Sequence, residues 1–116
     1  MYILKLKTGF SAAHQLTNAY DEKCNASIHG HNWKVLVEIK TEKLINNMVI
    51  DFKKIKEIID ELDHKNLNEV LDFEPTAELI AKYIYDKLVD FLLKNKKIEI
   101  IVTVWEADNA SITYFE

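Results

Sequence analysis

The sequence contains no arginine, since all fifteen of its basic residues are lysines. Any phosphate group must therefore be bound by lysines, backbone amides or helix ends, without the paired hydrogen bonds of a guanidinium group. The formal net charge of −4 disfavours a broad nucleic-acid surface. We therefore expect no nucleic-acid partner.

Cysteine, glycine and proline are also scarce, with one, two and one residues. A single cysteine cannot form a disulfide framework, which favours a reducing compartment, so we expect a cytoplasmic protein. Few glycines and prolines leave little material for linkers, and 116 residues suit one domain over 1–116. No apolar run approaches the roughly 18–20 residues of a membrane span, and the N-terminus does not resemble a signal peptide. No membrane partner is expected.

The periodicity of apolar residues predicts an α+β fold. Alternation indicates strands, whereas apolar residues at helical spacing after Asp51 and after Pro75 indicate helices. The six expected elements are strands at 2–10 and 31–41, helices at 52–62 and 76–93, and strands at 98–105 and 111–115. Residues 63–68 are expected to form a loop. The order ββααββ predicts an antiparallel four-stranded sheet with two helices packed on one face.

Three of the four histidines, His14, His29 and His31, are expected to lie together. Side chains two apart on a strand share a face, so His29 and His31 can hold one ligand across Gly30. His14 has the parity of the apolar residues of the first strand, and an antiparallel hairpin would bring it beside the other two. Three imidazoles with an open fourth position are typical of catalytic zinc. Three unrelated surface imidazoles are the alternative.

Two further groups are candidates for proton transfer. Cys24 has polar neighbours, and a nearby zinc ion or imidazolium would make its thiolate accessible near neutral pH. A lone cysteine is, however, more often a small buried residue. Asp63 and His64 can form a pair that tunes proton transfer, or His64 can simply be a histidine favoured at a helix end.

Glu106 continues the parity of an apolar strand face that includes Val102 and Val104. A carboxylate at the end of a buried face needs a partner, and it can accept hydrogen bonds from a heterocyclic ligand. The alternative is that the strand ends at Trp105 and leaves Glu106 solvated. The opposite face, with Ile101 and Trp105, is more apolar than a solvated sheet face should be, which favours subunit assembly.

Five motifs together resemble the 6-pyruvoyltetrahydropterin synthase family, which includes the 6-carboxytetrahydropterin synthases of the queuosine (7-deazaguanine) pathway. They are Phe10-Ser11-Ala12-Ala13-His14, Cys24 followed by His29-Gly30-His31-Asn32, Leu62-Asp63-His64-Lys65-Asn66-Leu67-Asn68, Pro75-Thr76-Ala77-Glu78 and Val104-Trp105-Glu106. The similarity covers essentially the whole chain. It implies the tunnelling fold, or T-fold, assembled through its sheets into a trimeric barrel. Two trimers then form a hexamer, with active sites between subunits.

The resemblance also implies roles for single residues. The zinc ligands match His14, His29 and His31, and the catalytic thiol matches Cys24. Asp63 and His64 match its proton-relay partners. Glu106 matches the carboxylate that anchors the pterin ring, helped by the segment around Thr76 and Ala77. The family's substrate is 7,8-dihydroneopterin triphosphate, and Zn²⁺ is its cofactor.

Two departures from the family pattern bear on the product and on phosphate binding. Four residues separate Cys24 from His29, whereas three are usual in the 6-carboxy enzymes and five in the animal 6-pyruvoyl enzymes. Gln15 stands where the family often has arginine. Either lysines such as Lys34 or Lys65 bind the triphosphate, or the substrate carries fewer phosphates. We expect a 6-carboxytetrahydropterin synthase. The alternatives are a 6-pyruvoyl or related side-chain-cleaving enzyme and, as a third reading, a non-catalytic zinc- or pterin-binding module.

Overall fold

The structure of the protein is a computed structural model, and it describes residues 1–17, 27–92 and 97–116. Within these ranges the chain is of the predicted α+β class. Its elements are β1 (Tyr2–His14), β2 (His29–Thr41), α2 (Phe52–Asp60), β3 (Lys65–Asn66), α3 (Leu67–Val70), α4 (Ala77–Leu92), β4 (Glu99–Ala107) and β5 (Ala110–Phe115). No helix in the described part of the chain is long and apolar enough to cross a membrane.

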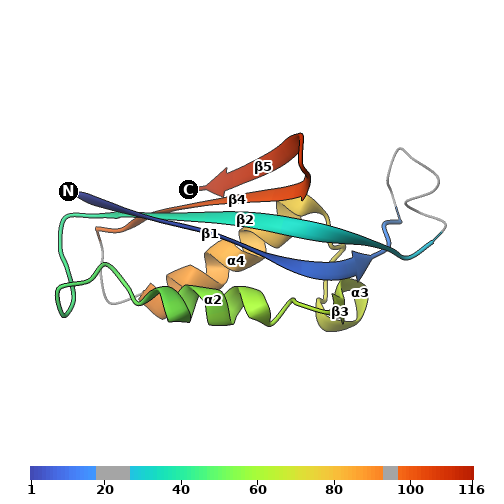
Figure 1. Cartoon of the computed structure of the whole chain (residues 1–116), viewed down its shortest axis with the longest axis horizontal. Helices are drawn as coiled ribbons and strands as arrows, with labels where there is room; N and C mark the ends of the chain where they lie inside the picture. The colour runs from blue at the N-terminus through green and yellow to red at the C-terminus, as the bar shows by residue number, and fades with distance from the viewer. Residues whose placement is uncertain (18–26, 93–96) are drawn as a thin grey trace.

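The strands form one sheet in the order β3-β1-β2-β4-β5 (Figure 1). β1 and β2 pair antiparallel over their whole length, from Tyr2 opposite Thr41 to His14 opposite His29. The predicted hairpin is therefore confirmed, and both strands extend to the histidines that the sequence placed at their ends. β4 then pairs antiparallel with β2 and with β5.

The core lies between the sheet and the helices α2 and α4, which lie on the same side of it (Figure 1). Alternate residues of β2, from Trp33 to Ile39, are fully buried, as the period of two requires. Ile55 and Ile59 of α2 and Ile80, Ile84 and Leu88 of α4 are also fully buried. The strand parity read from the sequence is thus correct over β2.

The expected loop at 63–68 is wrong in part, because this segment contains β3 and the start of α3. β3 runs parallel to β1, with Ala12 opposite Lys65 and Ala13 opposite Asn66. The sheet therefore has five strands in the described residues, where four were expected. A strand of two residues is too short to show a hydrophobic period, so only its pairing with β1 reveals it.

Gly9 lets β1 lie close to the backbone of β2 at Trp33. A Cβ atom at this position would lie 2.5 Å from the carbonyl oxygen of Trp33. We expect Gly9→Ala to lower the free energy of unfolding by about 1–3 kcal/mol, because the clash is with backbone. Gly30→Ala is the control, since its Cβ would meet no atom within 4 Å. Urea unfolding measures both variants, and equal midpoints for the two would contradict this prediction.

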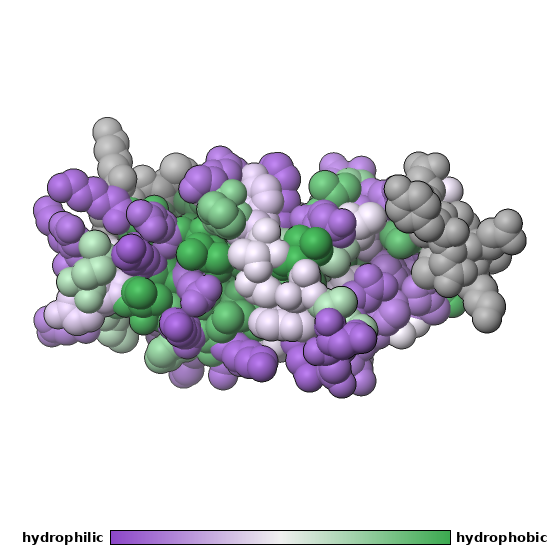
Figure 2. Space-filling model, turned by 90° about the horizontal axis from the view of Figure 1, so that it is seen from above, coloured by the Kyte–Doolittle hydropathy of each residue, from purple (hydrophilic) through white to green (hydrophobic). Residues whose placement is uncertain are grey.

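Part of the surface is apolar. Figure 2 shows the molecule from above, turned by 90° from the view of Figure 1. On this face, apolar residues gather in the middle of the molecule among hydrophilic ones. The exposed apolar side chains include those of Ile3 on β1 and Phe115 on β5, which are 54% and 66% exposed. Ile101 and Trp105, on the face of β4 directed away from the core, are half-buried.

Candidate metal centre and active site

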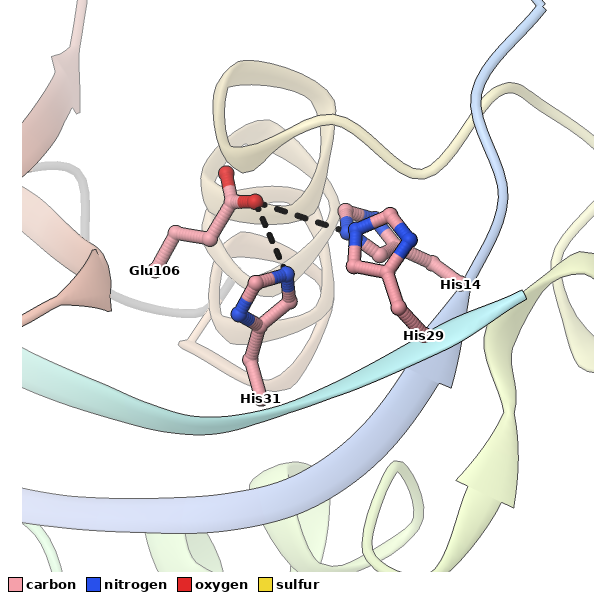
Figure 3. Close-up of side chains that lie close together, drawn as sticks. All are labelled: His14, His29, His31 and Glu106. Carbon is pink, nitrogen blue, oxygen red and sulfur yellow. Dashed lines mark ion pairs between the residues drawn. The ribbon is translucent and has the colours of Figure 1, made fainter. Parts of the chain in front are cut away.

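His14, His29 and His31 form one cluster at the end of the β1–β2 hairpin (Figure 3). His14 is the last residue of β1 and lies opposite His29, the first residue of β2. His31 is two residues further along β2, so it points to the same face. The ring centroid of His14 lies 4.6 Å from that of His29 and 5.0 Å from that of His31. The strand register thus brings together the three histidines that the sequence indicated.

Glu106 faces the same cluster from β4 (Figure 3). Its Oε1 atom lies 3.0 Å from Nε2 of His31 and 3.5 Å from Nε2 of His14. The pairing of β4 with β5 shifts register between Trp105 and Ala107, and such irregularities redirect a side chain. The alternative of a solvated Glu106 beyond the strand is therefore excluded. One ligand atom from each of the four residues lies within 4.8 Å of the others, so the cluster can hold a metal ion.

Backbone carbonyls fix which ring nitrogen of two histidines faces the cluster. Nδ1 of His14 donates a hydrogen bond to the carbonyl oxygen of Pro75 at 2.8 Å, and Nδ1 of His29 donates to that of Ser27 at 3.2 Å. A carbonyl can only accept, so Nδ1 carries a proton, and Nε2 is the ring nitrogen left to face a metal ion. Metal-binding histidines are held in the same way by an outer partner.

The chemistry of the cluster fits a divalent metal ion. Within the described residues, Nε2 of His14 and Nε2 of His31 are buried and have no hydrogen bond of good geometry, although the Glu106 carboxylate is near both. Nε2 facing a carboxylate at this distance is favourable when a proton or a metal ion lies between the two atoms. Three imidazoles and one carboxylate are a donor set suited to zinc.

Burial and the contacts within the cluster shift the pKa values of three of its residues. Burial lowers the pKa of His14. The contact of its ring with the Glu106 carboxylate, the hydrogen bond to the Pro75 carbonyl and the negative charge of Glu106 act the other way. Together they raise the pKa above its ordinary value. The contact with His14 lowers the pKa of Glu106 against the opposing effect of burial, and the charges of the three imidazoles add to this. The pKa of His31 is lowered, mainly by burial and by its histidine neighbours. The cluster therefore favours a negative Glu106 beside a positive charge, which either an imidazolium or a bound metal ion can supply.

Trp33 forms a rigid wall behind the cluster. It is 1% exposed, and its ring packs edge-on against His14 at 5.0 Å and against His31 at 5.4 Å. Its indole N–H donates to the carbonyl oxygen of Ala12 at 3.2 Å. The sequence placed Trp33 on the core face but gave it no part in the site, and nothing in the sequence indicated the contact of Pro75.

A cleft of about 560 Å³ opens beside His31. Its lining also includes His64, which faces solvent with its side chain 84% exposed. Asp63 Oδ2 lies 3.6 Å from Nε2 of His64. Of the predicted relay pair, His64 therefore lines the cleft together with His31, whereas Asp63, His14 and His29 are not among its lining residues.

Comparison with known proteins identifies the family. The model of the family described as 6-pyruvoyl tetrahydropterin synthase matches residues 3–116. The chain belongs to this family. An Archaeoglobus fulgidus protein, named provisionally as a 6-carboxy-5,6,7,8-tetrahydropterin synthase, is 37% identical over 102 residues, covering 84% of this chain and 85% of that protein. The dihydroneopterin monophosphate aldolase of Pyrococcus furiosus is 31% identical over 110 residues, covering 91% and 90%.

The fold comparison agrees with the family assignment. The solved structure of Caenorhabditis elegans 6-pyruvoyl tetrahydropterin synthase superposes with a TM-score of 0.75 and 30% identity, covering 100% of this chain and 97% of that one. The chain therefore has the T-fold that its motifs indicated. In the described residues, the five-stranded sheet is open and does not close into a barrel.

Cys24, the family's candidate thiol, lies outside the described residues, so its placement stays a prediction. The residues that precede this segment are held in place. The Asn68 side chain accepts from Gln15 N at 2.7 Å and donates to Gln15 O at 2.8 Å. The Glu74 carboxylate accepts hydrogen bonds from the amide and the hydroxyl of Thr17.

The remaining candidate residues show other contacts. Thr76 caps α4, because its hydroxyl accepts from the amide of Leu79 at 3.2 Å, and Ala77 is buried as the first residue of that helix. Both follow Pro75, whose carbonyl holds His14. Their contact with a pterin stays a prediction. Lys34 pairs with Asp108 at 2.7 Å, whereas Lys65 lines the cleft.

Proposed function

We propose that this chain is a zinc-dependent lyase that acts on 7,8-dihydroneopterin triphosphate. With one water molecule, the reaction gives 6-carboxy-5,6,7,8-tetrahydropterin, acetaldehyde and triphosphate. The observation that carries the proposal is the three-histidine cluster in a chain that belongs to this family. Two of its Nε2 atoms are buried and face the Glu106 carboxylate. An open site of three histidines is the arrangement of catalytic rather than structural zinc.

His14, His29 and His31 would hold the ion, which supplies Lewis-acid chemistry at a substrate oxygen. The carbonyls of Pro75 and Ser27 keep two of the imidazoles in the tautomer that binds metal. Trp33 closes the inner side of the cluster. The substrate side chain would therefore approach from the cleft beside His31.

Cys24 and His64 would move protons on the substrate side chain. A thiolate at Cys24 would take a proton from the carbon or hydroxyl next to the ring. His64 lines the cleft, and its exposed ring would rotate toward the substrate and return protons to it. Asp63 would form the proton-relay pair with His64.

Glu106 would anchor the pterin ring, whose ring N–H and amino groups are donors, with help from the segment of Thr76 and Ala77. The low pKa of Glu106 keeps its carboxylate ionised and ready to accept these hydrogen bonds.

We expect Glu106→Gln to retain zinc, since the three histidines remain, and to raise KM by about tenfold or more through loss of a charged hydrogen bond worth 1.5–3 kcal/mol. Metal analysis and initial rates measure the two effects. Loss of zinc with an unchanged KM would show that Glu106 is a metal ligand instead.

The reaction itself is tested by incubating the purified protein with 7,8-dihydroneopterin triphosphate and identifying the products by mass. Acetaldehyde and a 6-carboxy pterin are the expected products. A 6-pyruvoyl pterin would replace the proposal with the second candidate, and unchanged substrate would favour a non-catalytic zinc- or pterin-binding module.

The second candidate is a 6-pyruvoyltetrahydropterin synthase or a related enzyme that cleaves the pterin side chain. The four residues between Cys24 and His29 favour keeping this candidate, because this spacing lies between the spacings of the 6-carboxy and the 6-pyruvoyl enzymes. The similarity to an archaeal protein named as a dihydroneopterin monophosphate aldolase supports the side-chain-cleaving version. A substrate with fewer phosphates would also suit a chain without arginine.

We also propose that the sheet assembles into a trimeric barrel and that two trimers form a hexamer. The sheet of one chain leaves β3 and β5 at its edges, and unpaired edges invite strand pairing. The exposed Ile3 and Phe115 lie on β1 and β5, and subunit contacts would cover them. Light scattering on the purified protein measures the assembly, and a monomer would contradict it.

A further inference from the structure

The chain leaves the sheet directly after the cluster residue His14. β1 ends there, opposite His29, the first residue of β2. On the other side of β1, the parallel pairing with β3 ends at Ala13 opposite Asn66. Gln15 therefore lies past the end of both ladders in the described residues. Its backbone amide and carbonyl need hydrogen-bond partners from outside the sheet.

The side-chain amide of Asn68 supplies both partners. Its Oδ1 atom accepts from the amide of Gln15 at 2.7 Å, and its Nδ2 atom donates to the carbonyl of Gln15 at 2.8 Å. A carboxamide has an acceptor and a donor side by side, so it can pair with a backbone in both directions, as a neighbouring strand does. Asn68 comes two residues after Asn66. Its side chain thus continues the pairing of β3 with β1 where the backbone has already turned into α3.

The backbone that carries Asn68 is itself fixed. Leu67 and Leu71, on either side of it, are buried in the core, and the amide of Leu71 donates to the carbonyl of Leu67 at 3.0 Å. The amide of Asn68 donates to the side-chain oxygen of Asn66 at 3.1 Å. The carboxamide of Asn68 therefore extends from a short helix that is held at both ends.

The connection from α3 to α4 also holds the imidazole of His14. The carbonyl of Pro75 accepts from Nδ1 of His14, and the carboxylate of Glu74 accepts from the amide and the hydroxyl of Thr17. Residues 68–75 thus contact the ring of His14 and the backbone that follows it. His14 reaches the cluster from β1, whereas His29 and His31 reach it from β2. A change in the backbone next to His14 would therefore move one ligand relative to the other two.

We propose that Asn68 is a positioning residue of the metal centre, whose carboxamide fixes the backbone of Gln15 and thereby the direction of the His14 side chain. This inference rests on the metal-binding role that the proposed function gives to His14, and it does not depend on the substrate. It assigns to Asn68 two hydrogen bonds to backbone and no contact with the metal ion. The donor of the carboxamide is needed as well as its acceptor.

Two substitutions of Asn68 test this role. Asn68→Ala removes both hydrogen bonds. Asn68→Asp keeps an acceptor for the amide of Gln15 but places a second carboxylate oxygen against the carbonyl of Gln15. Zinc alone, without a pterin, is titrated into each protein in competition with a chromogenic chelator. We expect the Kd for zinc to rise about tenfold in Asn68→Ala and about threefold or more in Asn68→Asp, as is usual for groups that support metal ligands.

Asp51→Ala is the control for a general loss of stability. The Asp51 carboxylate caps α2 by accepting from the amide of Lys53 at 2.9 Å, and α2 begins on the side away from α3 (Figure 1). Loss of this cap lowers stability without touching the cluster. We expect the Kd for zinc in Asp51→Ala to stay within about twofold of wild type.

Two further measurements on the same proteins report position directly. Exchange of the Gln15 amide should be about tenfold faster in Asn68→Ala than in wild type and Asp51→Ala, because its acceptor is gone. Cobalt(II) in place of zinc gives a visible spectrum that depends on ligand geometry. This spectrum should change in Asn68→Ala and not in Asp51→Ala.

A wild-type Kd and an unchanged cobalt spectrum in Asn68→Ala would overturn the proposal. An equal rise of Kd in Asp51→Ala would also overturn it, because stability alone would then set the zinc affinity. If Asn68→Ala does not fold, Asn68→Asp decides by the same criteria, since its side chain has nearly the same volume as that of Asn68. Zinc binding without turnover in wild type would contradict the proposed lyase and leave this inference standing. A wild type that binds no zinc would overturn both.

Discussion

Replacing His31 with alanine should remove the metal ion and lower turnover by about a thousandfold or more. His31 is the best of the three ligands to test, because its side chain is 25% exposed. His14 is fully buried and bonded to Pro75, so its removal would also leave a cavity and a carbonyl without its donor. Loss of several kcal/mol of Lewis-acid stabilisation corresponds to roughly this factor in rate.

The effect of His31→Ala is measured by metal analysis and by the melting temperature with and without added zinc. A bound ion stabilises the folded state, so zinc should raise the melting temperature of wild type and not that of the variant. His64→Ala is the matched control, since it removes a histidine outside the cluster. It should keep about one zinc per chain while turnover falls. Full zinc content in His31→Ala would contradict the assignment.

Replacing Cys24 with alanine should lower kcat by about 10²–10⁴-fold, the usual contribution of a positioned acid or base. The thiol is assigned to proton transfer and not to metal binding, so zinc content and substrate affinity should stay close to wild type. Rapid-mixing rates, metal analysis and direct pterin binding measure the three quantities.

Cys24→Ser tests whether acidity of the thiol is what matters. A hydroxyl of similar size is a much weaker acid, so this variant should be nearly as slow as Cys24→Ala. Asn25→Ala, at the next residue in the sequence, is the control and should be active. A normal rate in Cys24→Ala would remove the thiol from the mechanism, and loss of zinc would make it a ligand.

The part of the site that the sequence predicted depends on strand parity. β1 and β2 are thirteen residues each, long enough for the period of two to fix which side chains face the core. A slip of one residue would turn an entire strand over, so the buried face specifies the register. That register places His14 opposite His29, and the three-histidine cluster follows from it.

The remaining features depend on contacts that leave no periodic pattern. β3 is two residues long and is defined only by its pairing with β1. The Pro75 carbonyl reaches His14 from 61 positions away, and any residue type could supply a carbonyl there. The orientation of Glu106 follows the alternation of Val102 and Val104, but its contact with His14 and His31 depends on the pairing of β4 with β2, which residue types alone do not give. The hydrogen bonds between Gln15 and Asn68 likewise join two segments whose packing the sequence does not give.

Removal and return of the metal ion test the central claim most directly. The purified protein is treated with a chelator, dialysed, and assayed with 7,8-dihydroneopterin triphosphate before and after one equivalent of zinc per chain is added. We predict that turnover is lost with the ion and restored with it, and that His31→Ala is not restored. A metal-free protein that turns over at the wild-type rate would contradict the account.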